Sequence, residues 1–417
     1  MLELSERNKR IFTVILFVCA VIVIGYLLYF FFFKPQTPAP TSPMATPGLN
    51  GSLSKAGAGS GVGSNPSGPG ALPSSGGVAV PVSPGAPETN GAPSRTTVLR
   101  DAITNSLSLS PSGTGVRSYN PLDGKFYRVL DDGTLASMSN QTFYNVQQVT
   151  WGNQTDKAVL QFNDGSKMIY NFSTQTQYSV PNYWQDFSFS PNDSSLAAKS
   201  VGNNENNRFL VVTDDKGGNA KYIEDIGNHQ DDVHVSWSPN NQIIAYSFTG
   251  DPVGFDRQAI VMVGQHQENF KELMVEGRGF IPNWSPSGNN ILYSVYSSAD
   301  NFEPSLWVSG AVGDMINADR RHINLQTWAD KCAWQNEHTI ICGVPTSLPQ
   351  GAGLQRETAN TIPDTIERVD IDTGTVTNLG QPDGNVAVQQ PVLSKDGQSL
   401  YFSDAQTGKL IKFSLAG

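Results

Sequence analysis

The chain has 417 residues, of which 38% are hydrophobic and 15% charged, and its formal net charge at pH 7 is −10. Residues 1–100 hold seven of the 27 basic and three of the 37 acidic side chains, which leaves 20 basic against 34 acidic side chains in residues 101–417, a net charge of −14. A domain this acidic repels phosphate backbones and anionic lipid. The charge therefore argues against nucleic acid as a partner.

The first 33 residues have the pattern of a membrane anchor. Residues 1–10 are polar and include Arg7, Lys9 and Arg10, and the next 23 residues, 11–33, carry no charge. As a helix with a rise of 1.5 Å per residue this stretch spans about 34 Å, and a hydrocarbon core is about 30 Å thick. The basic flank predicts a cytoplasmic tail at 1–10, one transmembrane helix at 11–33, and the rest of the chain outside the cytoplasmic membrane.

A cleaved signal peptide is the competing interpretation of the same stretch. The apolar run is longer than the roughly 7–15 residues of a typical signal-peptide core, and no small-x-small cleavage site ends it. Val18 stands before Cys19, where a lipoprotein cleavage site needs a small residue. We therefore predict an uncleaved anchor, with the cytoplasmic membrane as one partner of the chain.

Residues 34–97 are built from Pro, Gly, Ala, Ser and Thr, with almost no charge. Such a chain buries too little apolar surface to offset the entropy that it loses on ordering. The composition predicts a disordered linker with an end-to-end distance of about 40–50 Å. It would hold a folded C-terminal domain away from the bilayer.

A unit of roughly 40–50 residues recurs through the remainder of the chain. In its clearest copy, 232–248, Val233, Val235 and Trp237 alternate with polar residues before a Ser-Pro-Asn-Asn turn and a β-branched and aromatic run. These features predict a β-hairpin. Aligned on the residue before the turn, the copies have the anchors Tyr119, Trp151, Phe189, Trp237, Trp284, Trp334 and Leu393.

Further strand-like runs follow the hairpins. After the hairpin at Trp237 come 259–263 and 269–274. A repeat of four strands that cannot bury its own faces is typical of a β-propeller, in which each sheet packs against its neighbours. The anchors predict an all-β fold, a propeller of seven blades over residues 98–417, with six blades as the alternative count.

The last unit reaches the C-terminus with three strand-like runs, 390–393, 399–403 and 409–415, and lacks a fourth. A ring left open at this point would expose a sheet edge and lose the contact that closes it. We therefore expect a strand from within residues 96–109 to complete the seventh blade.

The repeated turn resembles that of a known family. The segments Ser190-Pro191-Asn192, Ser238-Pro239-Asn240 and Ser285-Pro286-Ser287-Gly288, each followed by an aliphatic run, are similar to the TolB-like repeat of bacterial β-propellers, relatives of the WD-repeat fold. Three units match well and four are degenerate. The resemblance supports the fold and says little about activity, because propellers host binding modules, hydrolases and lyases alike.

Cys332 and Cys342 both fall in the unit anchored at Trp334. If Trp334 faces Ile340 across the hairpin, the two cysteines face each other, and directly paired strand residues lie about 4.5–5.5 Å apart at Cα, within the range of a disulfide. A disulfide and a pair of small buried thiols both fit this register.

No motif in the sequence identifies an enzyme or a cofactor site. The five histidines form no pair with metal-ligand spacing, and a Gly-x-Ser-x-Gly elbow is absent from the sequence. His229 and His234 flank an acidic segment that would suit a metal or acid–base cluster, although a solvated turn before a strand is the simpler interpretation. We predict neither a cofactor nor a metal.

Long connections concentrate on one face of the predicted ring. The loop between the second and third strands of a blade lies on the same face as the connection to the next blade, and the segments 202–207, 250–257, 297–304 and 344–363 are all long. Binding groups are commonly carried on such loops. The residues expected at the channel mouth on this face are Trp184, Asp186, Asp232, His234, Arg278, Trp328 and Asp330.

Two functions fit these observations. The favoured one is a non-enzymatic scaffold, tethered outside a bacterial cytoplasmic membrane, that binds an envelope protein or a cell-wall polymer. The alternative is an envelope glycan hydrolase or lyase in which Asp186, Asp232 and His234 supply acid and base.

Overall fold

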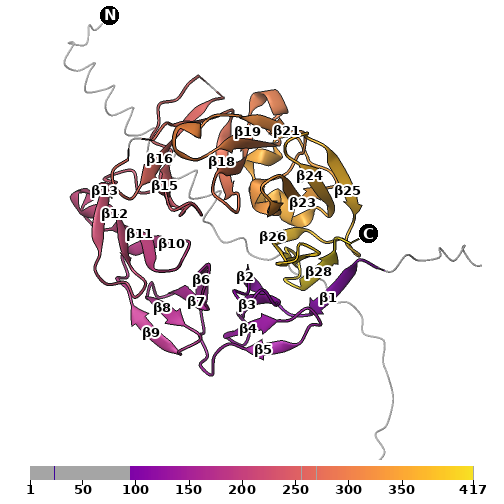
Figure 1. Cartoon of the computed structure of the whole chain (residues 1–417), viewed down its shortest axis with the longest axis horizontal. Coiled ribbons are helices and arrows are strands. Elements are labelled where there is room, and N and C mark those ends of the chain that lie inside the picture. The colour runs from indigo at the N-terminus through magenta and orange to yellow at the C-terminus, as the bar shows by residue number, and fades with distance from the viewer. Residues whose placement is uncertain (1–22, 24–93, 255, 269, 417) are drawn as a thin grey trace, which may run out of the picture. The chain divides into compact units, whose positions relative to one another are not determined.

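The computed structural model describes residues 23, 94–254, 256–268 and 270–416. From residue 94 onward the described residues belong to one compact unit. It contains seven four-stranded sheets arranged as the blades of a closed ring (Figure 1). The prediction of a seven-bladed, all-β propeller is confirmed.

The predicted tail at 1–10, span at 11–33 and linker at 34–97 lie outside the described residues, apart from Val23 and residues 94–97. Within the part of the chain that the structure describes, no helix is both long and apolar enough to cross a membrane.

Six blades take their strands in chain order, from the innermost to the outermost. Blades 1 and 2 consist of β2 (Asn105–Leu109), β3 (Val116–Asn120), β4 (Lys125–Val129), β5 (Leu135–Ser137), β6 (Val146–Trp151), β7 (Lys157–Phe162), β8 (Lys167–Asn171) and β9 (Thr176–Ser179). Blades 3 and 4 consist of β10 (Trp184–Phe189), β11 (Ser195–Val201), β12 (Arg208–Asp214), β13 (Lys221–Asp225), β14 (Val233–Val235), β15 (Ile243–Ser247), β16 (Gln258–Gly264) and β17 (Leu273–Val275).

Blades 5 and 6 consist of β18 (Arg278–Trp284), β19 (Asn290–Tyr296), β20 (Pro304–Gly310), β21 (Arg321–Ile323), β22 (Cys332–Asn336), β23 (Thr339–Pro345), β24 (Asp364–Asp370) and β25 (Val376–Gly380). Short 3-10 helices occupy some of the connections: η1 (Glu205–Asn207), η2 (Ser298–Asp300), η3 (Gly313–Met315), η4 (Ala329–Lys331), η5 (Ala352–Leu354) and η6 (Arg356–Thr361).

Blade 7 draws strands from both ends of the propeller sequence. Its order is β1 (Thr96–Arg100), β28 (Leu410–Ser414), β27 (Ser399–Asp404) and β26 (Val388–Leu393). The expected closing strand is confirmed, because β1 pairs antiparallel with β28 as the outermost strand. In Figure 1 the indigo β1 lies beside the yellow β28. This pairing closes the ring.

The repeated Ser-Pro turn joins the first and second strands of a blade. Its serine hydroxyl accepts a hydrogen bond from the backbone N–H five residues later, at the start of the second strand or next to it. The serines are Ser190, Ser238 and Ser285, and Ser394 accepts in the same way in a Ser-Lys-Asp-Gly turn of blade 7. The third residue after the serine has a positive φ, from +57° at Asp193 to +73° at Gly288. Gly, Asn and Asp are the residues that adopt this conformation most readily.

The anchor predicted for the first unit is wrong. Tyr119 lies in β3, the second strand of blade 1, and the turn after it leads to β4. The first turn of this blade begins at Ser110-Pro111-Ser112-Gly113, a fifth copy of the turn, in which the Gly113 N–H donates to the Ser110 carbonyl at 2.8 Å. Leu109 occupies the anchor position there, so an alignment on aromatic residues misses this copy.

Three of the four tryptophan anchors donate a hydrogen bond to the preceding blade. The Trp151 indole Nε1 donates to the Ser106 carbonyl at 2.6 Å, and the Trp284 Nε1 donates to the Ser236 hydroxyl at 2.8 Å. Trp334 donates in the same way to blade 5. Each acceptor lies on or next to the innermost strand of the preceding blade. Trp237 differs, because its Nε1 donates to the Asn241 side chain of its own turn.

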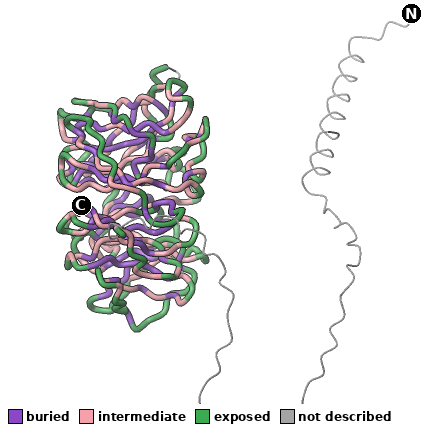
Figure 2. The backbone as a smooth tube through the Cα atoms, turned by 90° about the vertical axis from the view of Figure 1, so that its right-hand side faces the viewer, coloured by how far each residue is buried: buried purple, intermediate pink, exposed green. Residues whose placement is uncertain are grey.

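The hydrophobic core is a series of layers between blades. One layer packs Ile260 and Met262 of blade 4 against Ile291 and Tyr293 of blade 5. Second strands such as β19 are buried along most of their length because another blade covers each face. Figure 2 shows the buried segments inside the unit and the exposed ones along its boundary. A single blade could not shield these surfaces from water.

The face that carries the turns between first and second strands, here called the turn face, is held by carboxylates that bridge adjacent blades. Asp193 of blade 3 accepts hydrogen bonds of 2.6–2.8 Å from the three backbone N–H groups of residues 153–155 in blade 2. Glu337 of blade 6 accepts from the N–H and hydroxyl of Ser287 in blade 5, at 2.6 and 2.8 Å. These turns therefore support one another.

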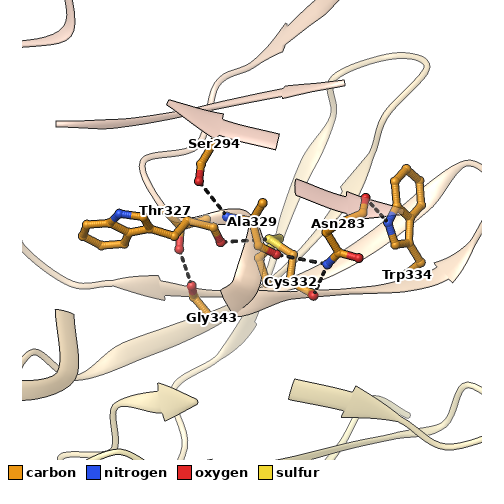
Figure 3. Close-up of a disulfide and its surroundings, with 9 residues drawn as sticks. Asn283, Ser294, Thr327, Ala329, Cys332, Trp334 and Gly343 are labelled. Atoms are coloured by element: carbon orange, nitrogen blue, oxygen red, sulfur yellow. Dashed lines mark hydrogen bonds between the residues drawn. A yellow bond between two sulfur atoms is a disulfide. The ribbon is translucent and has the colours of Figure 1, made fainter. Parts of the chain in front are cut away.

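Cys332 and Cys342 form a disulfide in the predicted register of blade 6 (Figure 3). The alternative of two free thiols is therefore wrong. The Asn283 amide of blade 5 donates to the carbonyls of Ala329 and Cys332 at 3.0 and 2.8 Å. The disulfide therefore lies within a hydrogen-bond network that joins blades 5 and 6.

Candidate functional site

The face opposite the turn face, here called the loop face, carries connections of very different lengths. Its second-to-third strand loops are 121–124 and 163–166 in blades 1 and 2, against 248–257 in blade 4 and 346–363 in blade 6. The predicted long insert is thus present in blade 6, where it forms η5 and η6. The connections on this face vary far more than the repeated turns opposite.

Five of the innermost strands have an irregular register near the loop face. The pairing of β2, β6, β10, β18 and β26 with its second strand shifts at a bulge. In four of them a residue at the bulge has a positive φ: Ser106 (+55°), Asp186 (+55°), Gly279 (+66°) and Gln390 (+51°). Bulges of this kind redirect side chains and are common next to binding sites.

The residue before each of these four positions is exposed to solvent: Asn105, Gln185, Arg278 and Gln389. Gln147 and Gln148 of β6 are exposed as well. The innermost strands border the centre of the ring (Figure 1). Because their flanks pack against neighbouring blades, these exposed side chains face the channel. We call Asn105, Gln147, Gln148, Gln185 and Gln389 the amide ring.

The side chains of the amide ring make no hydrogen bond to any group in the described part of the chain. Gln390, next to the ring, differs because its Oε1 accepts a hydrogen bond of 2.9 Å from the Leu107 N–H. An amide carries two donors and a carbonyl acceptor, so it suits peptide groups and hydroxyls equally well. The channel mouth therefore offers several unused donors and acceptors.

Asp186 and His234 lie together between blades 3 and 4. The Asp186 Oδ2 accepts a hydrogen bond of 2.8 Å from the Val235 N–H and lies 3.5 Å from the Lys199 ammonium and 4.0 Å from the His234 Nδ1. The His234 ring stacks on Tyr246 at 5.4 Å between centroids. Asp186 therefore braces the neighbouring blade as well as facing the histidine.

Burial sets the proton affinity of His234. Desolvation lowers the pKa of His234 below its ordinary value, while Asp186 opposes the shift. Burial also raises the pKa of Tyr246. The imidazole is accordingly neutral near pH 7, so one ring nitrogen donates a hydrogen bond and the other accepts one.

Both tryptophans predicted at the mouth are buried instead. Trp184 is 5% exposed and Trp328 is 2% exposed. Trp184 belongs to the core layer between blades 2 and 3, and Trp328 packs with Ala352 and Ala359 of the blade 6 insert. The expectation that these indoles face a ligand is therefore wrong, because blade packing and the insert cover them.

The remaining predicted carboxylates are engaged elsewhere. Asp232 lies 3.0 Å from the His229 Nδ1, so the two form an exposed pair at the turn before β14. Asp330 pairs with Arg356 of the insert at 3.0 Å. The Arg356 guanidinium also stacks over the Trp328 ring at 4.9 Å. Asp330 thus holds the insert down over blade 6.

A buried ion pair lies beneath the insert. The Lys331 ammonium is 2.7 Å from the Asp364 Oδ2, and both side chains are fully buried. The same oxygen accepts from the Val388 N–H of blade 7. Burial lowers the pKa of Lys331 and raises the pKa of Asp364, and each partner opposes the shift of the other. The pair joins blades 6 and 7 and is closed to solvent.

The described residues do not assemble a metal site. No group of three or more His, Cys, Asp or Glu side chains among them could hold an ion. Asp186 and Asp232 point to different partners, so the three residues considered for acid–base chemistry form only one contact, between Asp186 and His234. The mouth therefore has the chemistry of recognition: neutral amides, one exposed arginine and one imidazole.

The sequence did contain a signal for the amide ring. With the first anchor corrected to Leu109, the residues three and four positions before an anchor are Asn105-Ser106, Gln147-Gln148, Gln185-Asp186 and Gln389-Gln390. Strand alternation would place an apolar side chain at one position of each pair. A polar pair at the same place in four repeats therefore marks the bulges.

Comparisons with known proteins support the fold. No family model matches the chain, and no curated protein matches it. Among solved structures, an oligogalacturonate lyase from Vibrio parahaemolyticus is similar with a TM-score of 0.53 and 12% identity, over 76% of this chain and 93% of that one.

The tricorn protease is similar with a TM-score of 0.49 and 14% identity, over 78% of this chain. The match spans only 34% of the tricorn protease chain. The β-propeller domain of a Myceliophteria thermophila protein also has a TM-score of 0.49, at 10% identity, over 76% of this chain and 99% of that one. Of these three structures, only the oligogalacturonate lyase has a TM-score above 0.5, and at 12% identity its similarity is evidence for the fold alone.

Proposed function

We propose that this chain is a non-enzymatic binding scaffold whose loop face binds an envelope protein or a cell-wall polymer at the channel mouth. The observation that carries the proposal is the amide ring, a set of exposed amides on four innermost strands with no partner in the described part of the chain. A rigid ring that presents unused donors and acceptors from several blades is preorganised for a ligand. The acidic balance of the domain keeps phosphate-rich polymers away.

The proposed location is the outer side of a bacterial cytoplasmic membrane. Its support is the uncharged run at 11–33 behind a basic tail, and the Pro/Gly/Ser-rich composition of 34–97. Such an arrangement gives the propeller a reach of about 40–50 Å from the bilayer.

Cysteine labelling in spheroplasts tests this topology. Ser60→Cys lies in the linker, and Asn8→Cys lies in the predicted tail. A membrane-impermeant maleimide should label Ser60→Cys in intact spheroplasts and Asn8→Cys only after lysis. Labelling of Asn8→Cys alone, or of neither before lysis, would contradict the proposed orientation.

Site-specific photo-cross-linking tests the binding face. A photoreactive amino acid at Gln389 lies in the amide ring, whereas the same group at Asp396 lies in a Ser-Lys-Asp-Gly turn on the turn face. A discrete cross-linked product should form from Gln389 and not from Asp396. Products of equal yield from both positions would remove the loop face as the binding surface.

The second candidate function is an envelope glycan hydrolase or lyase at the same mouth. The contact between Asp186 and His234 favours it, because a neutral imidazole beside a carboxylate can move a proton. The fixed role of Asp186 as acceptor for the Val235 N–H weighs against it. Turnover of a glycan that disappears in the Asp232→Ala and His234→Ala double variant would establish the enzyme.

A further inference from the structure

The charge of the loop face is unevenly distributed around the ring. Over blades 1 and 2 and the entry to blade 3, which adjoin one another in Figure 1, this face consists of the segments 121–124, 138–145, 163–166 and 180–183. They contain two charged residues, Asp123 and Asp164. The two loop-face segments at blade 4, 226–232 and 248–257, contain four aspartates and one arginine. We call the first set of four segments the neutral arc.

The two carboxylates of the neutral arc are already engaged. Asp123 accepts a hydrogen bond of 2.8 Å from the Tyr127 hydroxyl and lies 3.8 Å from the Arg100 guanidinium. Asp164 accepts from the N–H and the hydroxyl of Ser166, at 2.9 and 2.6 Å. The groups that this part of the surface leaves available to a ligand are therefore uncharged.

Hydrogen bonds hold the neutral arc together across three blades. The donors and acceptors are the Phe143 N–H and the Gly124 carbonyl, the Asn163 N–H and the Asn145 carbonyl, and the Lys167 ammonium and the Asn182 carbonyl. The first two of these bonds are 2.7 and 3.1 Å long. The arc is thus one connected surface, and a ligand that spans it meets preorganised groups.

Exposed amides are concentrated on the neutral arc. Five of them have side chains that make no hydrogen bond to any group in the described part of the chain: Asn140, Gln141, Asn145, Asn163 and Asn182. Gln147, Gln148 and Gln185 of the amide ring lie on β6 and β10, directly after two of these segments. Each amide offers donors and an acceptor, which suit hydroxyl and N-acetyl groups. The arc therefore extends the channel mouth with further neutral groups.

Two exposed tyrosines accompany the amides. Tyr144 is 62% exposed and Tyr183 is 50% exposed. Tyr144 lies over the loop of blade 1, where a Cβ added to Gly124 would be 3.0 Å from its ring. The Tyr183 carbonyl accepts a hydrogen bond of 2.9 Å from the Val201 N–H, which fixes its backbone on blade 3. Each ring presents an apolar face and a polar hydroxyl to solvent.

The balance of amides and apolar groups favours a glycan over a protein. Leu122 is the one other large hydrophobic residue that is exposed in these four fully described segments. The buried core of a protein interface is about 65% apolar, and three apolar side chains among at least five amides do not provide such a core. A sugar instead needs separate flat apolar faces bordered by hydrogen-bonding groups.

We propose that the neutral arc binds an uncharged glycan, whose sugar rings stack on Tyr144 and Tyr183 and whose hydroxyl or N-acetyl groups pair with the amides around them. The net charge of −14 over residues 101–417 repels acidic polymers, which is why the glycan is a neutral one. This inference rests on the proposed function and deepens it, because it names the class of ligand that the loop face takes.

Isothermal titration calorimetry on the full chain tests the ligand class. The chain is kept in a polyoxyethylene detergent, which carries no sugar that could compete. The neutral probe is the hexamer of β-1,4-linked N-acetylglucosamine, and the acidic probe is a hexamer of galacturonic acid. The neutral hexamer should bind at least about tenfold more tightly, since like charges repel the acidic one.

Tyrosine variants test the position of the site. Tyr144→Ala and Tyr183→Ala should each weaken binding of the neutral hexamer at least about fivefold, because each removes one stacking ring. Tyr144→Phe keeps the ring and should bind within about twofold of the unchanged chain. Tyr222→Ala is the matched control, since Tyr222 is 72% exposed on β13, outside the neutral arc, and it should bind the hexamer as the unchanged chain does.

The outcomes separate this inference from the proposed function. Absence of binding by the neutral hexamer, equal binding of the acidic one, or equal affinity in Tyr144→Ala, Tyr183→Ala and the unchanged chain overturns the inference. A discrete protein product cross-linked from Gln389, with no glycan binding, overturns the inference and leaves the loop face as a protein-binding surface. Equal cross-linking from Gln389 and Asp396 removes the proposed function itself.

Discussion

The two faces of the ring are built on different principles. On the turn face the same short turn recurs, with a serine hydroxyl and a left-handed residue in each of its best copies, and carboxylates such as Asp193 and Glu337 tie one turn to the next. On the loop face the connections range from 121–124 to 346–363. The repeat therefore specifies how blades assemble, and the departures from it specify what the ring can recognise.

The long insert on the loop face is supported by contacts that are not part of the repeat. Below the long insert of blade 6 lie the Cys332–Cys342 disulfide and the buried pair of Lys331 and Asp364, and Arg356 of the insert stacks on Trp328. Among the described residues no other blade has a disulfide or an ion pair with both side chains fully buried, whereas an arginine also stacks on a tryptophan where Arg117 of blade 1 meets Trp151 of blade 2. The longest loop thus rests on the least repetitive packing, as expected for a surface that must hold a defined shape.

Removing a turn-face carboxylate should have the largest effect on stability. Asp193 is 2% exposed and accepts three backbone hydrogen bonds and one from the Thr155 hydroxyl. Asp193→Ala leaves those donors without the charged acceptor and should lower the free energy of unfolding by about 3–4 kcal/mol. Denaturant unfolding of the purified chain measures this loss.

The matched control for this prediction is Asp251→Ala, an exposed carboxylate in a loop-face connection of blade 4. It should change the free energy of unfolding by less than about 0.5 kcal/mol. An equal loss in the two variants would show that the faces do not differ in their contribution to stability.

Removing the disulfide should have the next largest effect. The bond joins two residues with a sequence separation of 10. The chain-entropy model gives about 3 kcal/mol for a loop of this size, so Cys332→Ala with Cys342→Ala should lose a comparable free energy of unfolding. A mass measurement under native conditions, before and after reduction, should show two hydrogens gained. An unchanged mass would show that the cysteines are thiols.

Acidification should weaken the contact between blades 3 and 4 by a smaller amount. Burial lowers the folded-state pKa of His234 below its unfolded value near 6.5. Below about pH 6.5 the unfolded chain therefore binds a proton that the folded chain does not, so this contribution to stability is lost as the pH falls toward the folded pKa.

His234→Gln cannot take up this proton, so its free energy of unfolding should depend less on pH between about 7.5 and 5.5 than that of the unchanged chain. Urea unfolding at the two pH values tests the sign. A variant with the same or a steeper pH dependence would show that His234 is not the group responsible.

The sequence predicted the scaffold better than the site. Seven blades, the closing strand and the register of Cys332 with Cys342 followed from periodicity, because each depends on spacing alone. Trp184 and Trp328 were predicted at the mouth, but neighbouring elements bury them, and a single hairpin pattern does not show what packs beside it. The topology of the anchor at 11–33 stays a prediction.

The bulges were harder to predict than the strands. Asp186 and Gln390 adopt positive φ without being glycine, so no glycine marked their positions. The shift turns the preceding Gln185 and Gln389 out of the blade, whereas simple alternation gives no reason to single them out. The alternation rule assumes a regular strand. It therefore does not predict bulges, which arise where the inner strands pack around a channel.

One measurement tests the central claim that the loop face binds and the turn face holds the ring. The full chain, extracted in mild detergent, is compared with Gln185→Ala and Gln389→Ala for the amount of partner that co-purifies and for the free energy of unfolding. The account predicts that at least about tenfold less partner co-purifies with the double variant than with the unchanged chain. The free energies of unfolding of the two should agree within about 0.5 kcal/mol. Full retention of the partner by a stable double variant would contradict it.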